Sequence, residues 1–441
     1  MPPVLNIQPE EIDTNEKRSK YTISVVGCGQ KGILFAIAFA DVGFKVVCSD
    51  ADQSVVKKVA KGKSPFIAPE FESKLKGLMN SSQLSVSGEL KKAASKSDII
   101  IITMPAKVDD KKKIDYSEVL NAFKQVGSTL HPGALVIYGG VVGLGFIEGI
   151  AKETLENTSG LKAGQDFGLA YMPLNSSDAN LKLFANFQLK VAGVGKTSLE
   201  ATTNILKTIT KNVKQISDVK TAEIATLFTV AKQDADTALA NELAVFCESA
   251  NTDYFEVLKL LGLNDKAFWP TTIEETDTNE VYLLLESADN INAKLKLPTL
   301  SRQINEDMVK HAVNLTQEAL RSCGKNLRRA KVAVLGTGNA PTGTFVKMLE
   351  LKGAKISLFE PASRREPLDL GVVKNSLSEA VEGTDCIIIL NDEEQFRHLN
   401  LKKLKPLMRS PSVIVDLAGV FERQQVEPEG FIYRGLGKGT T

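Results

Sequence analysis

A glycine-rich turn between two strand-like runs constrains this chain more than any other feature. An apolar, β-branched run leads directly into the pattern G-x-G-x-x-G, whose glycines are Gly27, Gly29 and Gly32. A helical pattern follows, and the next apolar run ends on Asp50. An acidic residue about 20 positions after such glycines, at the end of the following strand, is typical of a dinucleotide-binding βαβ unit.

Each part of this pattern has a physical role in binding a dinucleotide. The first glycine permits a tight turn, the second lets the backbone approach a pyrophosphate, and the third lets the helix pack close to the strand. The helix N-terminus offers amide groups and a positive dipole end to the phosphates. Asp50 would accept hydrogen bonds from a ribose 2′-hydroxyl and would repel a 2′-phosphate, so we predict NAD rather than NADP.

The alternative interpretation of the same pattern is a tight strand–helix turn that holds no ligand. Strand, helix, second strand and terminal acid agree here, which favours cofactor binding. The predicted cofactor-binding residues are Gly27, Gly29, Gln30, Lys31, Gly32, Asp50 and Pro105, the last of which ends the apolar run 97–105.

Composition and charge exclude several other classes of protein. The chain has 441 residues and a net charge of +1, so neither nucleic acid nor a membrane is expected as a partner. The first 20 residues have no apolar core typical of a signal peptide, and no apolar run is long enough to span a bilayer. We therefore expect a cytoplasmic protein whose residues 1–20 form a disordered extension.

The cysteines and histidines argue against a metal site. None of the five cysteines forms a C-x-x-C pair, and the three histidines lie far apart in the sequence. The cysteines are interpreted as small buried apolar residues in a reducing compartment, not as disulfides or metal ligands. No metal site is predicted.

The pattern of predicted elements divides the ordered chain into three parts. Residues 21–195 alternate strands with helices, which implies a doubly wound parallel sheet. Residues 196–326 have a helical period throughout, and 221–247 form one long helix of roughly 40 Å. Residues 327–441 alternate strands with helices again. The fold class predicted is α/β, with two Rossmann-like doubly wound parallel-sheet domains joined by a helical domain with a long central helix.

The third part repeats the plan of the first. A strand-like run over 331–335 leads into Gly336 and Gly338, then into a helix, and then into a strand that ends on Glu360. A nucleotide-type ligand is expected at the carboxyl ends of such strands. A weaker alternative is a different nucleotide bound by these glycines, and they can also be a simple strand–helix turn.

A second glycine-rich stretch, 139–149, follows the strand predicted over 134–138. In this fold the nicotinamide end of NAD is expected near such a loop. The stretch either approaches the cofactor closely or accommodates packing, and the sequence favours neither interpretation.

The order of these parts resembles the UDP-glucose/GDP-mannose dehydrogenases, the nucleotide-sugar 6-dehydrogenases. The resemblance covers almost the whole chain, from Tyr21 to Gly439. The central-helix segment A-L-A-N-E-L-A, for example, is similar to the family's I-A-L-x-N-E-L. The segments that carry the resemblance are 62–70, 105–119, 159–173, 238–244 and 430–439.

The resemblance implies a specific chemistry. Members of the family oxidise the C6 hydroxymethyl group of a UDP- or GDP-linked sugar to a carboxylate with two NAD. A cysteine forms a thiohemiacetal and then a thioester, while a Lys and an Asn on the central helix stabilise the oxyanion. A Thr and a Glu of the first domain assist proton transfer and hydrolysis. A homodimer through the central helix is expected as well, because long helices between two α/β domains commonly form a dimer face.

The positions that carry this chemistry depart from the family pattern. The segment that should hold the cysteine, 263–276, has neither a Gly-Gly pair nor a cysteine. Two arginines that the family uses in the second domain are also missing, near 338–344 and at Ala418. The residues found at the family's Lys, Asn, Thr and Glu positions are Thr226, Val230, Gly140 and Leu174.

Without the nucleophile the thioester route is closed, so no catalytic residue is assigned. A single two-electron oxidation could use Lys232, Asp234, Asp236 or Lys266, although solvated surface charges are the favoured interpretation of these residues. Two hypotheses follow. The chain is either an NAD-dependent oxidoreductase of this family with altered chemistry, or a catalytically silent paralogue, a pseudoenzyme that binds NAD and acts as a regulatory or partner subunit.

Overall fold

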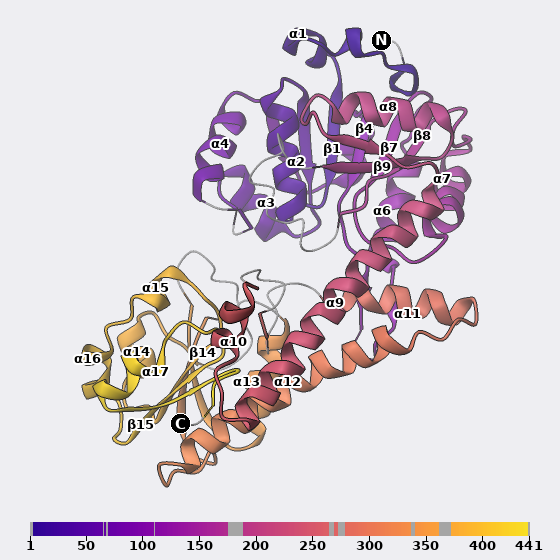
Figure 1. Ribbon diagram of the computed structural model, residues 1–441. Coiled ribbons are helices and arrows are strands. Elements are labelled where there is room, and N and C mark those ends of the chain that lie inside the picture. Colours follow the sequence, from indigo (N-terminus) through magenta and orange to yellow (C-terminus); the bar gives the residue numbers. More distant parts are fainter. Residues whose placement is uncertain are drawn as a thin grey trace. The chain divides into compact units, whose positions relative to one another are not determined.

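The computed structural model describes residues 3–64, 66–67, 69–109, 111–174, 188–263, 269–271, 278–336, 340–360 and 372–439 (Figure 1). It contains two compact units. The first comprises residues 1–230 and 279–294, and the second comprises 231–278 and 295–441. The long helix α9 (Val219–Ser249) begins in the first unit and ends in the second.

The first unit contains an eight-stranded sheet with the order β10-β9-β8-β7-β4-β1-β2-β3. Its pairs are parallel except β8 with β9, so β9 and β10 run opposite to the other strands. The strands are β1 (Thr22–Val26), β2 (Lys45–Ser49), β3 (Leu84–Ser87), β4 (Ile99–Ile102), β7 (Leu135–Tyr138), β8 (Gly168–Tyr171), β9 (Leu189–Gly193) and β10 (Val213–Gln215).

Helices cover both faces of this sheet because alternate strand residues are apolar on both sides. In β4, Ile99 and Ile101 pack against one helical layer, and Ile100 and Ile102 pack against the other. The first layer contains α2 (Gln30–Asp41), α3 (Gln53–Ala60), α4 (Pro69–Asn80) and α8 (Lys196–Leu206). The second contains α5 (Leu90–Ala94), α6 (Ser117–Gly127), the π-helix η3 (Phe146–Ala151) and α7 (Lys152–Ser159).

The N-terminal segment differs from its prediction as a disordered extension. It forms η1 (Val4–Asn6), η2 (Pro9–Glu11) and α1 (Asn15–Arg18). Three of its apolar side chains, those of Val4, Ile7 and Ile12, are buried in the core of the first unit. The polar composition of this segment concealed these few apolar positions, whose burial offsets the cost of ordering the segment.

The second unit contains a six-stranded parallel sheet with the order β13-β12-β11-β14-β15-β16. The strands are β11 (Lys331–Leu335), β12 (Lys355–Phe359), β13 (Val372–Val373), β14 (Cys386–Ile389), β15 (Ser412–Asp416) and β16 (Phe431–Gly435). Side chains of α12 (Lys296–Arg321) and α13 (Ala340–Leu351) pack on one face. The other face is covered by α14 (Leu377–Val381), α15 (Glu394–Arg397), α16 (Leu401–Leu404) and α17 (Arg423–Val426).

The remaining elements are short or connect these layers. A two-stranded hairpin is formed by β5 (Lys107–Val108) and β6 (Ile114–Asp115). Helix α10 (Tyr254–Leu261) begins at Asp253, whose carboxylate accepts hydrogen bonds from the Phe255 and Glu256 amides. The last helix of the first unit is α11 (Val281–Asn290), and 3-10 turns lie at η6 (Thr278–Glu280), η8 (Lys405–Leu407) and η9 (Glu427–Glu429).

The predicted fold class is confirmed, since two Rossmann-like α/β sheets are connected by long helices. Two details differ from the prediction. The first sheet is not wholly parallel, because β9 returns antiparallel to β8. The helical part predicted over 196–326 does not form a unit by itself, since α8 and β10 extend the first unit and α12 packs in the second.

Candidate functional site: a dinucleotide loop in the first unit

The turn between β1 and α2 requires glycine at two of its three glycine positions. Gly27 has φ +99°, and a Cβ atom on Gly32 would lie 1.8 Å from the Gly27 carbonyl oxygen. Gly29 is different, because a Cβ there would meet no described atom within 4 Å. The protein itself therefore does not explain Gly29, whereas a pyrophosphate drawn against the backbone does.

The loop is anchored to both neighbouring strands. The Gly27 amide donates to the Ser49 carbonyl oxygen at 2.8 Å. From the other side, the Thr103 hydroxyl, just beyond β4, lies 3.1 Å from the Val26 and 3.2 Å from the Gly27 carbonyl oxygen. Sequence analysis missed Thr103, and the signal that could have found it is its place at the carboxyl end of a central strand.

Asp50 lies beside the loop, directly after β2. Its Oδ2 accepts a hydrogen bond from the Cys28 amide at 2.7 Å, and its Oδ1 accepts one from the Asp52 amide at 2.9 Å. The carboxylate is half-buried. Because an ionised carboxylate has about four acceptor sites, Asp50 can support the loop and still accept a bond from a ribose hydroxyl.

The other predicted cofactor-binding residues lie at the same edge of the sheet. Gln30 is exposed in the first turn of α2, and among the described residues no side chain caps that helix. The Lys31 ammonium donates to the Leu174 carbonyl oxygen, beyond β8, at 2.8 Å. Pro105 is exposed beyond β4. The structure thus gathers the seven residues at the carboxyl ends of the strands, while their contact with a cofactor stays a prediction.

These residues fit NAD, because an open Gly29, an uncapped helix start and a carboxylate at the next strand end match its pyrophosphate and ribose. NAD, when bound, supplies a hydride acceptor. Gly27, Gly29, Gly32 and Asp50 would hold its adenosine and pyrophosphate portions.

Aromatic side chains fill the next part of this edge, after β7 and β8. Tyr138 and Tyr171 are buried with ring centroids 6.4 Å apart. The Tyr138 hydroxyl donates to the Met104 carbonyl oxygen at 2.9 Å. Burial raises the pKa of both phenols, so both are neutral at physiological pH.

Gly140 and Leu174, which the sequence comparison predicted at the family's Thr and Glu positions, lie near this part of the sheet, Gly140 against Tyr138 and Leu174 against Gly139. A Cβ on Gly140 would lie 2.9 Å from the Tyr138 hydroxyl oxygen, and a Cβ on Gly139 would lie 3.2 Å from Cδ1 of Leu174. Tyr138 and Gly140 therefore fit each other sterically, since a larger residue at 140 would meet the phenol.

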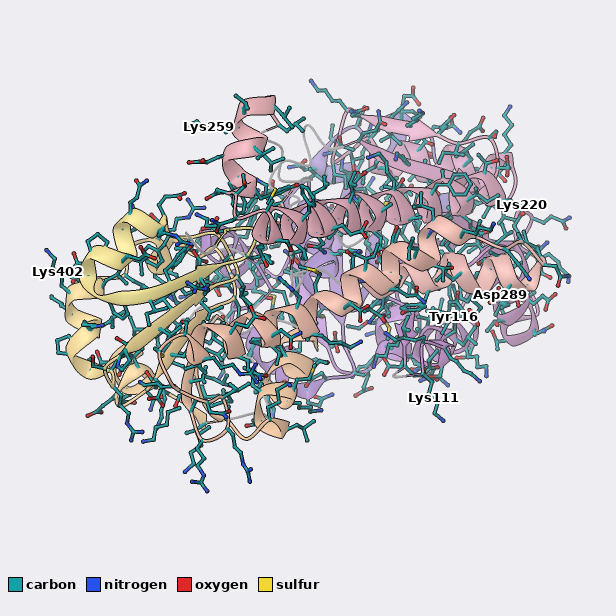
Figure 2. All side chains as sticks on the ribbon, turned by 60° about the horizontal axis from the view of Figure 1, so that its bottom comes forward. Lys111, Tyr116, Lys220, Lys259, Asp289 and Lys402 are labelled. Atoms are coloured by element: carbon teal, nitrogen blue, oxygen red, sulfur yellow. The ribbon has the colours of Figure 1, made fainter. Side chains whose placement is uncertain are left out.

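The glycine-rich stretch 139–149 is bonded to side chains of the protein. The Gly143 amide donates to the hydroxyl of Tyr116, the residue before α6 that Figure 2 labels, at 2.9 Å. Glu223 of α9 is buried and accepts from the Gly145 and Ile147 amides at 2.6 and 2.9 Å. Burial raises the pKa of this carboxyl group, against the opposing effect of its amide partners. For residues 143–147 these bonds favour the packing interpretation.

Helix α9 carries the residues that the sequence comparison predicted at the family's Lys and Asn positions. Thr226 and Val230 are buried, and the Thr226 hydroxyl donates to the Ala222 carbonyl oxygen at 2.8 Å. Lys232 pairs with Asp236 at 2.5 Å on the exposed surface, as a solvated helix charge would. Lys266 lies outside the described residues.

Asp234 differs from these surface charges, because it belongs to a buried polar network of the second unit. Arg302 of α12 donates to its Oδ1 at 2.6 Å, and Asn305 donates to the same oxygen at 2.9 Å. Asn305 also accepts from Asn241, which in turn accepts from the Thr271 amide. Burial raises the pKa of Asp234 despite the Arg302 charge. Through the Thr271 amide, the network holds residues 269–271, which belong to the segment that lacks the cysteine. Residues 264–268 and 272–276 of that segment lie outside the described residues.

At three strand ends of the second unit, the described residues pack against protein or are buried. A Cβ on Gly336, whose φ is +83°, would lie 2.3 Å from Oδ1 of Asn391. Glu360 is buried after β12. Asp416 is buried at the end of β15 and accepts from the Phe421 amide at 2.8 Å and the Tyr433 hydroxyl at 3.1 Å. Gly338 lies outside the described residues.

The described residues contain neither a candidate membrane-spanning helix nor a candidate metal cluster. None of their helices combines the length and apolarity that a membrane span needs. They also contain no group of three or more His, Cys, Asp or Glu side chains arranged to hold a metal ion.

The fold and the first loop define a dinucleotide-binding protein with two Rossmann-like domains. Residues 21–217 match the NAD binding domain of the UDP-glucose/GDP-mannose dehydrogenase family, and residues 335–423 match the UDP binding domain of that family. The chain belongs to the UDP-glucose/GDP-mannose dehydrogenase family. Its NAD cofactor, predicted from the sequence, is confirmed by this assignment.

Relatives support the assignment over nearly the full length. The chain is 28% identical over 433 residues to a UDP-N-acetyl-D-mannosamine dehydrogenase of Pyrococcus horikoshii, covering 95% of this chain and 99% of the relative. It is 31% identical over 321 residues to Protein CapL of Staphylococcus aureus, covering 71% of this chain and 74% of the relative. The solved structure of a UDP-D-ManNAc dehydrogenase from Pyrococcus horikoshii superposes with a TM-score of 0.83 at 26% identity, covering 95% of this chain and all of the other.

Proposed function

We propose that this chain binds NAD at the loop of its first unit and does not catalyse the four-electron oxidation typical of its family. It acts instead as a silent paralogue, a regulatory or partner subunit. The proposal is carried by the contrast between the dinucleotide loop and the residues predicted at the family's catalytic positions. The loop keeps an open Gly29, while the resemblance puts Gly140, Leu174 and Thr226 at the positions of the family's Thr, Glu and Lys.

The first support is the aromatic pair at the edge of the sheet. A buried Tyr138 hydroxyl lies where a side chain at 140 would begin, so restoring a Thr at 140 alone meets steric resistance. Thr226 offers no positive charge, and its hydroxyl proton is directed to the Ala222 carbonyl oxygen. An oxyanion formed here would lack the preorganised cation that such chemistry needs.

The second support comes from the sequence alone. The chain has no cysteine between Cys247 and Cys323, so the segment 263–276 contains no thiol. A second hydride can leave only from a tetrahedral adduct of the aldehyde, which a thiolate forms well. Oxidation to the uronate by the family's route therefore has no nucleophile in this chain.

A second candidate function is an altered dehydrogenase activity. The Pyrococcus horikoshii relative is named a UDP-N-acetyl-D-mannosamine dehydrogenase, and the family's UDP binding domain matches residues 335–423. A single two-electron oxidation of a nucleotide sugar to an aldehyde would need one base, and among the residues named for it from the sequence Asp234 is a buried carboxylate of α9. Its pairing with Arg302 and Asn305 argues for a structural role instead.

The proposed partner surface is the exposed apolar face of α9. Leu239, Leu243 and Phe246, spaced by one helical turn, are 51%, 45% and 67% exposed. Such a stripe on a helix is typical of a protein–protein interface. We propose that it forms a homodimer, or pairs this chain with an active subunit of the same family. Light scattering of the wild type and of Leu243→Asp tests this, and an unchanged mass would contradict it.

The experiment that tests the proposed function uses the purified full chain. NADH absorbance is followed with saturating NAD and, in turn, UDP-glucose, UDP-N-acetylmannosamine, UDP-N-acetylglucosamine and GDP-mannose. We expect no NADH from any sugar, although calorimetry detects NAD binding. Two NADH per sugar would overturn the proposal, and one NADH per sugar would establish the altered dehydrogenase instead.

A further inference from the structure

Two thiols lie together directly beneath the dinucleotide loop. Cys28 stands between Gly27 and Gly29, and Cys48 belongs to β2. Their Sγ atoms are 2.8 Å apart, and both side chains are fully buried. A disulfide bond is about 2.05 Å long, so the two sulfur atoms need to approach by only about 0.8 Å.

The backbone around the two cysteines is already held together. The Cys28 amide donates to Asp50, two residues after Cys48, at 2.7 Å. The Gly27 amide donates to the carbonyl oxygen of Ser49, next to Cys48, at 2.8 Å. These two bonds hold the loop at the end of β2, beside Cys48.

We propose that Cys28 and Cys48 form a dithiol–disulfide site that links the dinucleotide loop covalently to β2 and couples the redox state of the chain to NAD affinity. The proposal rests on the proposed binding of NAD at this loop. Gly27 and Gly29, the neighbours of Cys28 in the chain, are half-buried. A small oxidant that reaches either glycine is therefore one residue away from Cys28.

The oxidant we infer is a peroxide, which oxidises the two thiols in two displacement steps. The Cys28 thiolate attacks one peroxide oxygen, an S–O bond forms, the O–O bond breaks, and the departing hydroxide takes up a proton to become water. The Cys48 sulfur then attacks the Cys28 sulfur, which forms the S–S bond and breaks the S–O bond. The second hydroxide leaves with the Cys48 proton as water, so two thiols lose two electrons and one hydrogen peroxide gives two waters.

The order of the two cysteines follows from their surroundings. The hydrogen bond with Cys28 and burial both raise the pKa of the Cys48 thiol, so we assign Cys48 the second step, in which it reacts as a thiol. Cys28, at the loop, is the one nearer to the peroxide. Disulfides of proteins in reducing compartments are commonly transient and redox-sensing. A single reversible Cys28–Cys48 bond is of this kind.

The disulfide should tighten NAD binding. It closes a covalent link across residues 28–48, so the loop loses conformational freedom before the cofactor arrives. We expect the oxidised chain to bind NAD about threefold more tightly, and to unfold at a temperature several degrees higher than the reduced chain.

The test uses the full chain, reduced, treated with hydrogen peroxide, or treated and then re-reduced with dithiothreitol. Mass spectrometry of peptides identifies the Cys28–Cys48 link, and calorimetry measures NAD binding of each form. We expect the link and tighter binding after peroxide, and reversal of both after dithiothreitol. Cys48→Ala should abolish the response to peroxide, and the matched control Cys247→Ala, a buried cysteine of α9, should retain it.

Two results would overturn the proposal. Peptides with both thiols free after peroxide would remove the disulfide site, and a disulfide with unchanged NAD affinity would remove the coupling. If neither the reduced nor the oxidised chain binds NAD, the proposed function is contradicted instead. The mass of the linked peptide would still show whether the disulfide forms.

Discussion

Each Rossmann-like unit of this chain has a packed glycine directly after its first strand, and the first unit also shows an open glycine beside it. Gly27 and Gly336 both have positive φ, and a Cβ on either would meet a side chain, that of Thr103 or that of Asn391. In the first unit Gly29 faces open space, and the strand-end carboxylate Asp50 is half-buried beside it. In the second unit the strand-end carboxylates Glu360 and Asp416 are buried, and Gly338 lies outside the described residues. The first loop thus combines a glycine that packs with a glycine that leaves space for a ligand.

The comparison shows how to separate a binding glycine from a packing glycine. A packing glycine has a neighbour where its Cβ would be, so its substitution changes stability. A binding glycine has none, so its substitution changes affinity and leaves the fold intact. Substituting each glycine in turn tests the distinction directly.

The largest effect is expected for Gly336→Ala. An alanine at 336 would have to keep φ +83°, and its Cβ would lie 2.3 Å from Oδ1 of Asn391. The free energy of unfolding should therefore fall by about 2–4 kcal/mol. The matched control is Gly383→Ala, also at positive φ but with its nearest described neighbour 3.9 Å away; it should lose only about 1–2 kcal/mol. Denaturant unfolding measures both, and equal losses would contradict the packing role.

Gly29→Ala should have the next largest effect, and on affinity instead of stability. The extra methyl group occupies the surface against which the pyrophosphate lies, so NAD binding should weaken by about thirtyfold, ~2 kcal/mol. Stability should stay within about 0.5 kcal/mol. Gly77→Ala on α4, equally open, is the control whose NAD affinity should not change. Unchanged NAD affinity in Gly29→Ala, by calorimetry, would remove the proposed cofactor loop.

Asp50→Asn should weaken NAD binding by about tenfold, ~1.4 kcal/mol, because a charged acceptor for the ribose hydroxyl is lost. The preference for NAD over NADP should fall as well, since the charge that repels a 2′-phosphate is gone. Asp52→Asn, which can still cap α3 through its amide oxygen, is the control. If the two variants bind NAD equally well, the role assigned to Asp50 is wrong.

The smallest effect concerns pH and the second unit. Burial lowers the pKa of His311, but its bond to Glu248 at 2.8 Å and the Glu248 and Glu318 charges outweigh this, and the net shift is upward. A raised pKa in the folded state adds stability below the unfolded value of about 6.5, and this is lost as pH rises through the folded value. Thermal unfolding across that range should show the loss in the wild type and not in His311→Gln. If the same pH dependence of stability remains in His311→Gln, His311 is not its source.

Local sequence pattern predicted much of the first site. The β-branched run, the spacing of Gly27 and Gly32, and Asp50 after the next strand are all set within about thirty residues, so one βαβ unit contains the whole signal. The two sheets followed from the same alternation of strands and helices. The ordered structure of N-terminal residues 3–20 could not be predicted in this way, because it depends on a few apolar side chains that contact a core distant in the sequence.

The rest of the site depends on contacts between distant parts of the chain. Nothing local shows that Thr103 reaches the Gly27 carbonyl oxygen, or that Glu223 accepts from the Gly145 amide. The fit of Tyr138 to Gly140 appears only when both are placed in three dimensions. The Cys28–Cys48 contact likewise requires the register that sets β2 beside β1.

This chain is proposed to keep the NAD site of its family without the oxidation. A calorimetric titration of the reduced full chain with NAD, followed in the same sample by UDP-N-acetylmannosamine while NADH absorbance is recorded, tests both halves of this proposal. We expect saturable NAD binding that Gly29→Ala weakens, and no NADH after the sugar is added. NADH formation at two per sugar, or the absence of any NAD binding, would overturn it.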